Sequence, residues 1–478
     1  MDFRRRGRFS VALRWTLAVL VLLLAGGTAF VFWTLSRWDA DIEREVAAIE
    51  ASGAPLGPQD LSLAPAAGPT WWSSMPSWEG PAIEAALWEP EDLDELLQRP
   101  DDELAPYGRD LLERLRALYA ERAGDRLAVS ELRLLLREKG PPSPPNDGPP
   151  PEAEALAARI QDAASDALVR LAEGACDGPG FDGKGWVDAW LASDEPLPSP
   201  GPFVVPLEVQ SAVGRRAWLA AYDGDAERAL RHLRLGFCAA HGFEAAPGAV
   251  HALVWSLQTE RATKALLGVA ALLPDADLSE FDAALERVDA RARAVRALEE
   301  ERTIGYAVLE RGLDPGGEGG WLSPVKSFLV KLFDRNDTRV FLRTHAALLA
   351  AARGPIGEAQ DAVERTMRDL SDETFALRSQ LMVPHAASLL SVAADLEART
   401  TLARAVLLAR SVNAPAALEW ITARMDPFAD RPYRAEIDAD GVLRAWSVGR
   451  NRVDDGGDGS ENELNGVLDI VVFVRPPG

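Results

Sequence analysis

The chain has 478 residues, of which 47% are hydrophobic, and its formal net charge is −23 because 74 acidic residues face 51 basic ones. One hydrophobic core rarely serves this length, so two or three structural units are expected. The acidic excess argues against nucleic acid as a partner, since that affinity depends on Lys and Arg neutralising phosphates.

The N-terminal region predicts one membrane span. Residues 15–35 contain no charge in 21 residues, a length that just crosses a hydrocarbon core of about 30 Å. Residues 1–14 carry five arginines, and acids follow the span, so the positive-inside rule keeps this basic tail in the cytoplasm. We therefore predict a signal anchor in a bacterial-type inner membrane, with the remaining chain extracytoplasmic. The alternative is a cleaved signal peptide, whose apolar stretch is usually shorter.

Residues 36–70 predict a stalk and linker, because a short helical continuation runs into Gly, Pro and Ala. Residues 71–206 predict a helical subdomain with proline-rich loops. Helical patterns occupy about 107–121, 128–136 and 152–173, and the proline-rich run at 139–151 separates the last two. Gly/Pro-rich breaks at 174–185 and 196–206 end this subdomain.

Residues 207–424 form a nearly uninterrupted helical pattern, which makes the fold class mainly α. Within it, residues 217–230 read as a helix that ends at Gly224 and a second helix capped by Asp225. This stretch resembles one helix-turn-helix unit of tetratricopeptide-type repeats, but no 34-residue recurrence accompanies it. The sequence leaves open a degenerate helical hairpin array and a closed bundle.

The sequence offers no catalytic motif. None of its five histidines has metal-ligand spacing, and no nucleophile elbow or phosphate loop occurs. The two cysteines, Cys176 and Cys238, are either free or joined in a disulfide, which an oxidising compartment would permit. Carboxylate runs such as 299–301 keep a glycan or peptide hydrolase of the cell envelope as an alternative.

The last segment, 425–478, predicts a small β module. Two strands, at 434–438 and 442–447, are joined by Asp440-Gly441, and a third strand is expected at 469–474. The intervening loop is rich in glycine and carboxylates, which suits a hard cation such as Ca²⁺. As an EF-hand this loop fails, because Gly456 stands at position three and Asn465 at position twelve.

This module resembles the C-terminal region of the major pseudopilins of type II secretion systems. The shared pattern is Asp426-Pro427-Phe428, Pro432-Tyr433, residues 447–451, Gly456-Gly457 and Asp469-Ile470, in that order. The resemblance implies a calcium loop whose ligands are Ser447, Asn451, Asp454 or Asp455, and Asp469. Asn451 stands where the family usually has Asp, and the insert before Asp469 is longer.

A pseudopilin proper is not expected, because the residues after Gly7 lack the glutamate of the family's leader and a long helical body precedes the module. We therefore expect a non-enzymatic, membrane-anchored scaffold or interaction protein, with an unidentified protein partner in a secretion or pilus-like assembly. An atypical pseudopilin, processed after Gly7, is the other alternative.

Overall fold

The computed structural model describes residues 30–61, 63 and 204–311, and parts of 155–193, 323–373 and 376–474. The helices expected at 107–121 and 128–136 and the proline-rich run at 139–151 lie outside the described residues. The chain divides into two compact units. Unit 1 comprises 1–61, 302–347 and 365–384, and unit 2 comprises 62–301, 348–364 and 385–478.

Unit 1 is built from a helix at residues 30–51 and from parts of four long helices that continue into unit 2. These are α13 (Ala290–Glu310), α14 (Ser323–Arg353), α15 (Ile356–Asp372) and α16 (Leu377–Ser411). The helices pack closely at Gly305, where an added Cβ would lie 2.2 Å from the ring of Phe341. Asp337 of α14 accepts hydrogen bonds from the backbone N–H of Arg378 and Ser379, which caps the start of α16.

The predicted span, 15–35, lies mostly before the first described residue. Among the residues that the structure describes, no helix has both the length and the apolar character needed to cross a membrane. The helix at 30–51 begins with three exposed aromatic side chains, Phe30, Phe32 and Trp33, which are 58–65% exposed. The chain then turns through a short 3-10 helix, η1 (Pro58–Asp60).

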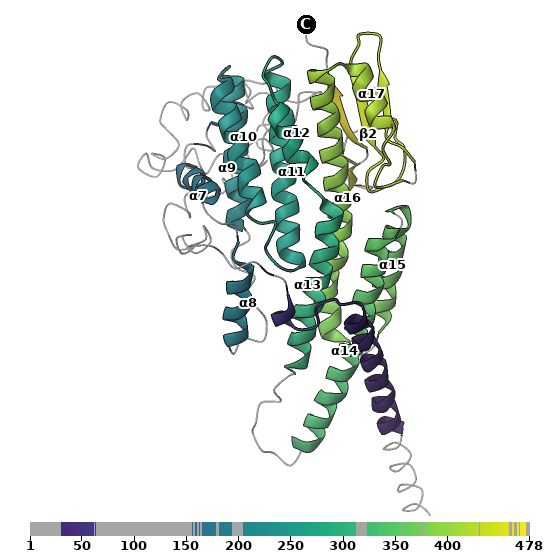
Figure 1. Ribbon diagram of the computed structural model, residues 1–478. Coiled ribbons are helices and arrows are strands. Elements are labelled where there is room, and N and C mark those ends of the chain that lie inside the picture. The colour runs from purple at the N-terminus through teal and green to yellow at the C-terminus, as the bar shows by residue number, and fades with distance from the viewer. Residues whose placement is uncertain are drawn as a thin grey trace, which may run out of the picture. The chain divides into compact units, whose positions relative to one another are not determined.

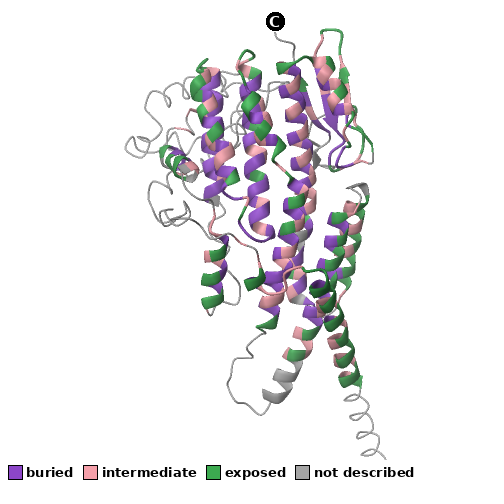
Figure 2. Ribbon diagram, viewed as in Figure 1, coloured by how far each residue is buried: buried purple, intermediate pink, exposed green. Residues whose placement is uncertain are grey.

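Unit 2 contains a stack of helices that lies almost entirely within the helical region predicted at 207–424. Helices α9 (Val204–Tyr222), α10 (Ala226–His241) and α11 (Ala249–Leu272) contact one another (Figure 1). Gly224, with φ +77°, forms the turn between α9 and α10, and the Asp225 carboxylate accepts a hydrogen bond from Arg228 N at 3.0 Å. Helix α11 is buried along most of its length (Figure 2).

Two shorter helices precede this stack, α7 (Asp166–Asp177) and α8 (Gly183–Ala192). Both run into the Gly/Pro-rich break expected at 174–185, so that expectation was wrong in part. Asp182 caps α8 by accepting a hydrogen bond from Gly185 N, and buried Val187 and Trp190 hold the helix in place. Tertiary burial outweighs the poor helix propensity of glycine here.

A disulfide joins Cys176 of α7 to Cys238 of α10, with 5.6 Å between their Cα atoms. The two cysteines are 62 residues apart in sequence. The bond therefore closes a long loop and joins α7, which precedes the stack in the chain, to α10 within the stack. Of the two alternatives that the sequence left open, the structure has the bonded one.

After the stack, unit 2 also contains α12 (Ser279–Glu286), most of the long α16, and α17 (Ala414–Thr422), which leads into the C-terminal module. The sheet of the module has the order β1-β2-β5, with antiparallel pairing throughout. Its strands are β1 (Arg434–Ile437), β2 (Leu443–Ser447) and β5 (Ile470–Val474), as the sequence predicted. A mainly α protein with a small three-stranded sheet near its C-terminus is thus confirmed.

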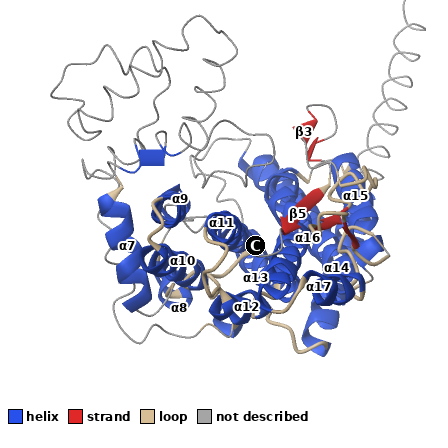
Figure 3. Cartoon of the chain, turned by 90° about the horizontal axis from the view of Figure 1, so that it is seen from above, coloured by secondary structure: helices blue, strands red, loops and turns tan. Residues whose placement is uncertain are grey.

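A second pair of short strands, β3 (Glu461–Asn462) and β4 (Gly466–Val467), lies in the insert before Asp469. The sheet of the module is packed against helices and not suspended on a linker (Figure 3). Residues of β2 and β5 share one hydrophobic core with α10, α11, α12, α16 and α17. The module is therefore part of unit 2.

Candidate functional site

The candidate site lies where β2 ends and β5 begins. The antiparallel register pairs Ser447 with Ile470, so Asp469 stands beside the end of β2. The loop at 448–457 leaves from the same place. This pairing brings residues more than 20 positions apart in sequence to one edge of the sheet.

The loop is shaped by backbone positions in the left-handed region. Gly449, Gly456 and Gly457 have φ values of +63°, +72° and +75°. Arg452 shares this conformation with φ +60°, although it carries a side chain. Gly457 also has no room for a Cβ, which would lie 2.7 Å from the Arg444 guanidinium. The consecutive left-handed residues Gly456 and Gly457 turn the end of the loop so that Gly457 N donates a hydrogen bond to Asp469.

Three of the five predicted ligands come together. The Asn451 amide donates a hydrogen bond to the Asp455 carboxylate at 2.8 Å. The Asp469 carboxylate accepts hydrogen bonds from Gly457 N at 2.6 Å and from Asp455 N at 3.5 Å. The Asn451 and Asp455 side chains are thus joined directly, and Asp469 is linked to Asp455 through the Asp455 backbone N–H.

The other two predicted ligands have different partners. The Ser447 hydroxyl donates a hydrogen bond to Asp426 at 2.8 Å and is fully buried. The Asp454 carboxylate accepts hydrogen bonds from Arg434 at 3.0 Å and from the Trp446 indole at 3.1 Å. In this arrangement Ser447 and Asp454 support the loop from outside the group.

Asp426 is a central residue of the module that the ligand set did not include. Its carboxylate is buried and accepts hydrogen bonds from the backbone N–H of Phe428 and Val448, both at 2.9 Å, and from Ser447. It therefore links the segment before β1 to the start of the loop. Its place in the Asp-Pro-aromatic element was the sequence signal that could have identified it.

The electrostatics of the group favour a cation. Burial raises the pKa of Asp469, and the neighbouring carboxylates of Asp455 and Asp454 raise it further. By contrast, hydrogen bonds from Trp446 and Arg434 lower the pKa of Asp454. The repulsion that contributes to the raised pKa of Asp469 would be relieved by a divalent cation bound beside it.

The fit to Ca²⁺ is partial. Within the described part of the chain, no group of three or more His, Cys, Asp or Glu side chains is arranged to hold a metal ion. Ca²⁺ also accepts amide and backbone oxygens, and its coordination is flexible. Asp455 and Asp469 could supply carboxylate oxygens and Asn451 an amide oxygen after a rotation of its side chain, with backbone carbonyls of the loop completing the shell.

Two arginines of the loop bind the helices of unit 2. Arg450 forms an ion pair with Asp395 of α16, and Arg452 forms one with Asp361 of α15. The Asp395 side chain is 12% exposed, whereas Asp361 is 60% exposed. The conformation of the loop is therefore tied to the helical part of unit 2.

Three buried histidines and two acids of the run at 299–301, which are catalytic candidates by residue type, each make a structural contact in the fold. His232, His251 and His345 are buried, and each hydrogen-bonds through Nδ1 to a backbone carbonyl four residues earlier. In the acidic run, Glu300 accepts a hydrogen bond from Gly248 N and pairs with Arg293, and Glu301 accepts one from Ala249 N. These acids hold the start of α11 against α13.

Comparison with known proteins gives no relative: no protein-family model, no curated protein and no solved structure matches this chain.

Proposed function

We propose that this protein is a membrane-anchored, extracytoplasmic scaffold whose C-terminal loop binds Ca²⁺ and whose helical surface binds a protein partner. The observation that carries the proposal is the loop itself, in which Asn451, Asp455 and Asp469 meet between two strands. An ion there would fix a loop that also contacts α15 and α16. Calcium would thus act as a structural element of the whole of unit 2.

Two observations support an extracytoplasmic location with an anchor. The Cys176–Cys238 disulfide suits an oxidising compartment such as the periplasm. Phe30, Phe32 and Trp33 are mostly exposed at the start of the first described helix, near the C-terminal end of the uncharged stretch 15–35. Aromatic side chains in that place are stabilised by a membrane interface, and in water they would be poorly accommodated.

The helical stack supports a role in binding. Adjacent antiparallel helices offer extended surfaces for a protein partner, as the helical hairpins of repeat proteins do. The loop resembles that of a secretion pseudopilin, so the partner class that we propose is a component of a secretion or pilus-like assembly. The sequence after Gly7 argues against polymerisation of this chain as a pilin.

The direct test is calorimetric titration of Ca²⁺ into the full-length protein in detergent, beside Asp455→Asn and Asp469→Asn variants. We expect saturable binding in the micromolar to millimolar range, with affinity at least roughly tenfold weaker in each variant. Asp440→Asn is the matched control, because Asp440 is an exposed acid in the β1–β2 turn. Wild-type protein that gives no heat and no rise in melting temperature with millimolar Ca²⁺ would remove the calcium proposal.

The location is tested separately. In spheroplasts, protease should digest the body of the chain and leave the N-terminal tail protected. Non-reducing electrophoresis should show faster migration than the reduced protein because of the Cys176–Cys238 bond. A body protected from protease and two free thiols would place the protein inside the cell.

A further inference from the structure

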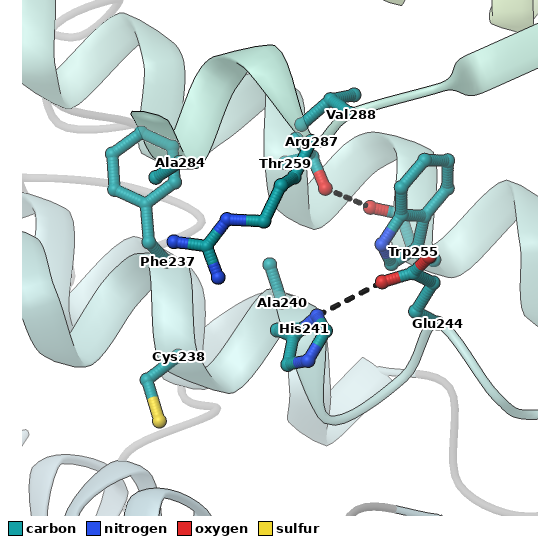
Figure 4. A pocket seen from close by; sticks show the side chains of 10 residues that line it. All are labelled: Phe237, Cys238, Ala240, His241, Glu244, Trp255, Thr259, Ala284, Arg287 and Val288. Carbon is teal, nitrogen blue, oxygen red and sulfur yellow. Dashed lines mark hydrogen bonds and ion pairs between the residues drawn. The ribbon is translucent and has the colours of Figure 1, made fainter. Parts of the chain in front are cut away.

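A cavity of about 210 Å³ lies in unit 2 between the C-terminal ends of α10 and α12 and the middle of α11, away from the calcium loop. It is lined mostly by apolar side chains, with three ionisable groups at its edge (Figure 4). Its lining includes Phe237, His241, Glu244, Trp255, Ala284 and Arg287.

The walls of the cavity are rigid and apolar. Trp255 is 3% exposed, so its ring forms part of a packed wall. Phe237 packs against Phe281 of α12, with 5.5 Å between ring centroids. The hydroxyl of Thr259 already donates to the carbonyl of Trp255 at 2.9 Å, so it offers no free donor to a ligand. An apolar group that entered would meet surfaces that are already ordered.

The guanidinium of Arg287 gives the cavity a positive charge. Its Nε donates to Ala283 O at 3.0 Å, at the end of α12, which fixes the base of the guanidinium. Figure 4 shows the guanidinium reaching across the cavity, between Phe237 and Ala240. Among the described residues, no carboxylate forms an ion pair with Arg287.

The acids that could have neutralised Arg287 are used by other residues. Glu280 of α12 pairs with Arg234, and Asp282 and Glu286 pair with Arg404. On the far side of the cavity, Glu244 pairs with His241, with 2.8 Å between Oε2 and Nδ1. The positive charge of Arg287 is thus the one left uncompensated in the lining of this cavity.

We propose that this cavity binds a small organic carboxylate with an apolar body. The carboxylate would accept hydrogen bonds from the two Nη groups of Arg287, the geometry in which guanidinium binds carboxylates best. The apolar body would lie against Phe237 and Trp255. The cavity is smaller than the roughly 300–1,000 Å³ typical of pockets for drug-sized ligands, so the ligand is of the size of a phenyl-substituted short acid.

The probe is 3-phenylpropionate, titrated into the full-length protein and followed by calorimetry. We expect saturable binding in the micromolar to low millimolar range, and at least roughly tenfold weaker binding by Arg287→Gln, because a charged bidentate contact is lost. Arg231→Gln, an exposed change on α10 that removes the same charge outside the cavity, should leave the affinity unchanged. Phenethylamine, which has a similar body and the opposite charge, should not bind.

A second variant separates the cavity from simple surface charge. Ala284→Leu fills the cavity and keeps Arg287, so it should also abolish binding, and its melting temperature shows whether it folds. Arg287→Lys keeps the positive charge but loses the planar guanidinium that makes two hydrogen bonds to one carboxylate, so it should bind 3-phenylpropionate with intermediate affinity. Absence of binding to wild-type protein, equal binding by Arg287→Gln, or equal binding of the amine would each overturn the proposal.

Discussion

The helical stack and the C-terminal module share one hydrophobic core but are stabilised in different ways. In the stack, small buried residues such as Ala217 and Ala229 let α9 and α10 pack closely. In the module, the buried residues include Asp426, Ser447 and Asp469. Asp426 and Asp469 accept hydrogen bonds from backbone N–H groups, and Ser447 donates one to the Asp426 carboxylate. The stability of the stack therefore depends on how closely small side chains fill its core. The stability of the module depends on buried polar groups that are hydrogen-bonded.

The largest expected effect is in the module. Asp426→Ala would leave Ser447 and two backbone N–H groups without their acceptor in a buried place, at a cost of about 3 kcal/mol in unfolding free energy. Asp438→Ala is the control, since Asp438 also accepts two backbone hydrogen bonds but is exposed in the β1–β2 turn. Chemical denaturation measures both. A loss as small as that of the control would show that the buried carboxylate is not central to the module.

The stack should respond to pH through His232. Burial, with the charges of nearby arginines, lowers the pKa of His232 to about 4. The unfolded chain binds this proton near pH 6.5, so the stabilising contribution is present above that pH and is lost as the pH falls toward 4. Between pH 7 and 5 the loss should be about 2 kcal/mol.

His232→Gln does not titrate, so its unfolding free energy should fall by about 2 kcal/mol less than that of wild type over the same interval. His345, whose pKa burial also lowers to about 4, contributes equally to both proteins and cancels in the difference. Identical pH dependence of the two proteins would mean that folding does not change the pKa of His232 from its unfolded value.

Overpacking tests the dependence of the stack on volume. Ala217→Leu places three extra carbon atoms at a fully buried position and should cost about 1–3 kcal/mol. Ala283→Leu, at an exposed position of α12, should change stability by less than about 0.5 kcal/mol. The midpoints of urea unfolding compare them directly, and equal midpoints would indicate that the stack has room to adjust.

The smallest effect concerns the two arginines that join the loop to the helices. Asp395→Asn removes a largely buried partner of Arg450 and should cost about 1 kcal/mol. Asp361→Asn removes an exposed partner of Arg452 and should cost less than about 0.5 kcal/mol. Thermal unfolding with and without Ca²⁺ would show whether either change also alters the stabilisation by the ion. The reverse ranking would show that Arg452 is the stronger link.

Part of the fold was predictable from local pattern. The strands of the module and the turn at Gly224 follow from alternation, from Asp-Gly and from a glycine that adopts φ +77°. Helix α8 was not predicted, because Gly183 and Gly185 weaken the local signal and the burial of Val187 and Trp190 holds that helix. Propensity is a weak determinant where tertiary contacts decide.

For the candidate site, sequence order gave the residue types but not their partners. The predicted ligand set contains Asn451, Asp455 and Asp469 together with Ser447 and Asp454, and nothing in the spacing distinguishes the residues that meet from those that do not. The difference depends on Trp446 and Arg434, which bind Asp454, and on Asp426, which binds Ser447. These partners come from other strands and turns.

The amino-acid sequence alone determined the mainly helical class, the place of the sheet and the glycines that its loop needs, because these depend on neighbours a few residues apart. Only the tertiary structure decided that Cys176 meets Cys238, that the module shares its core with α16, and that Arg287 has no carboxylate partner among the described residues. Such contacts join residues far apart in the chain, and their free energy depends on burial that no local pattern records.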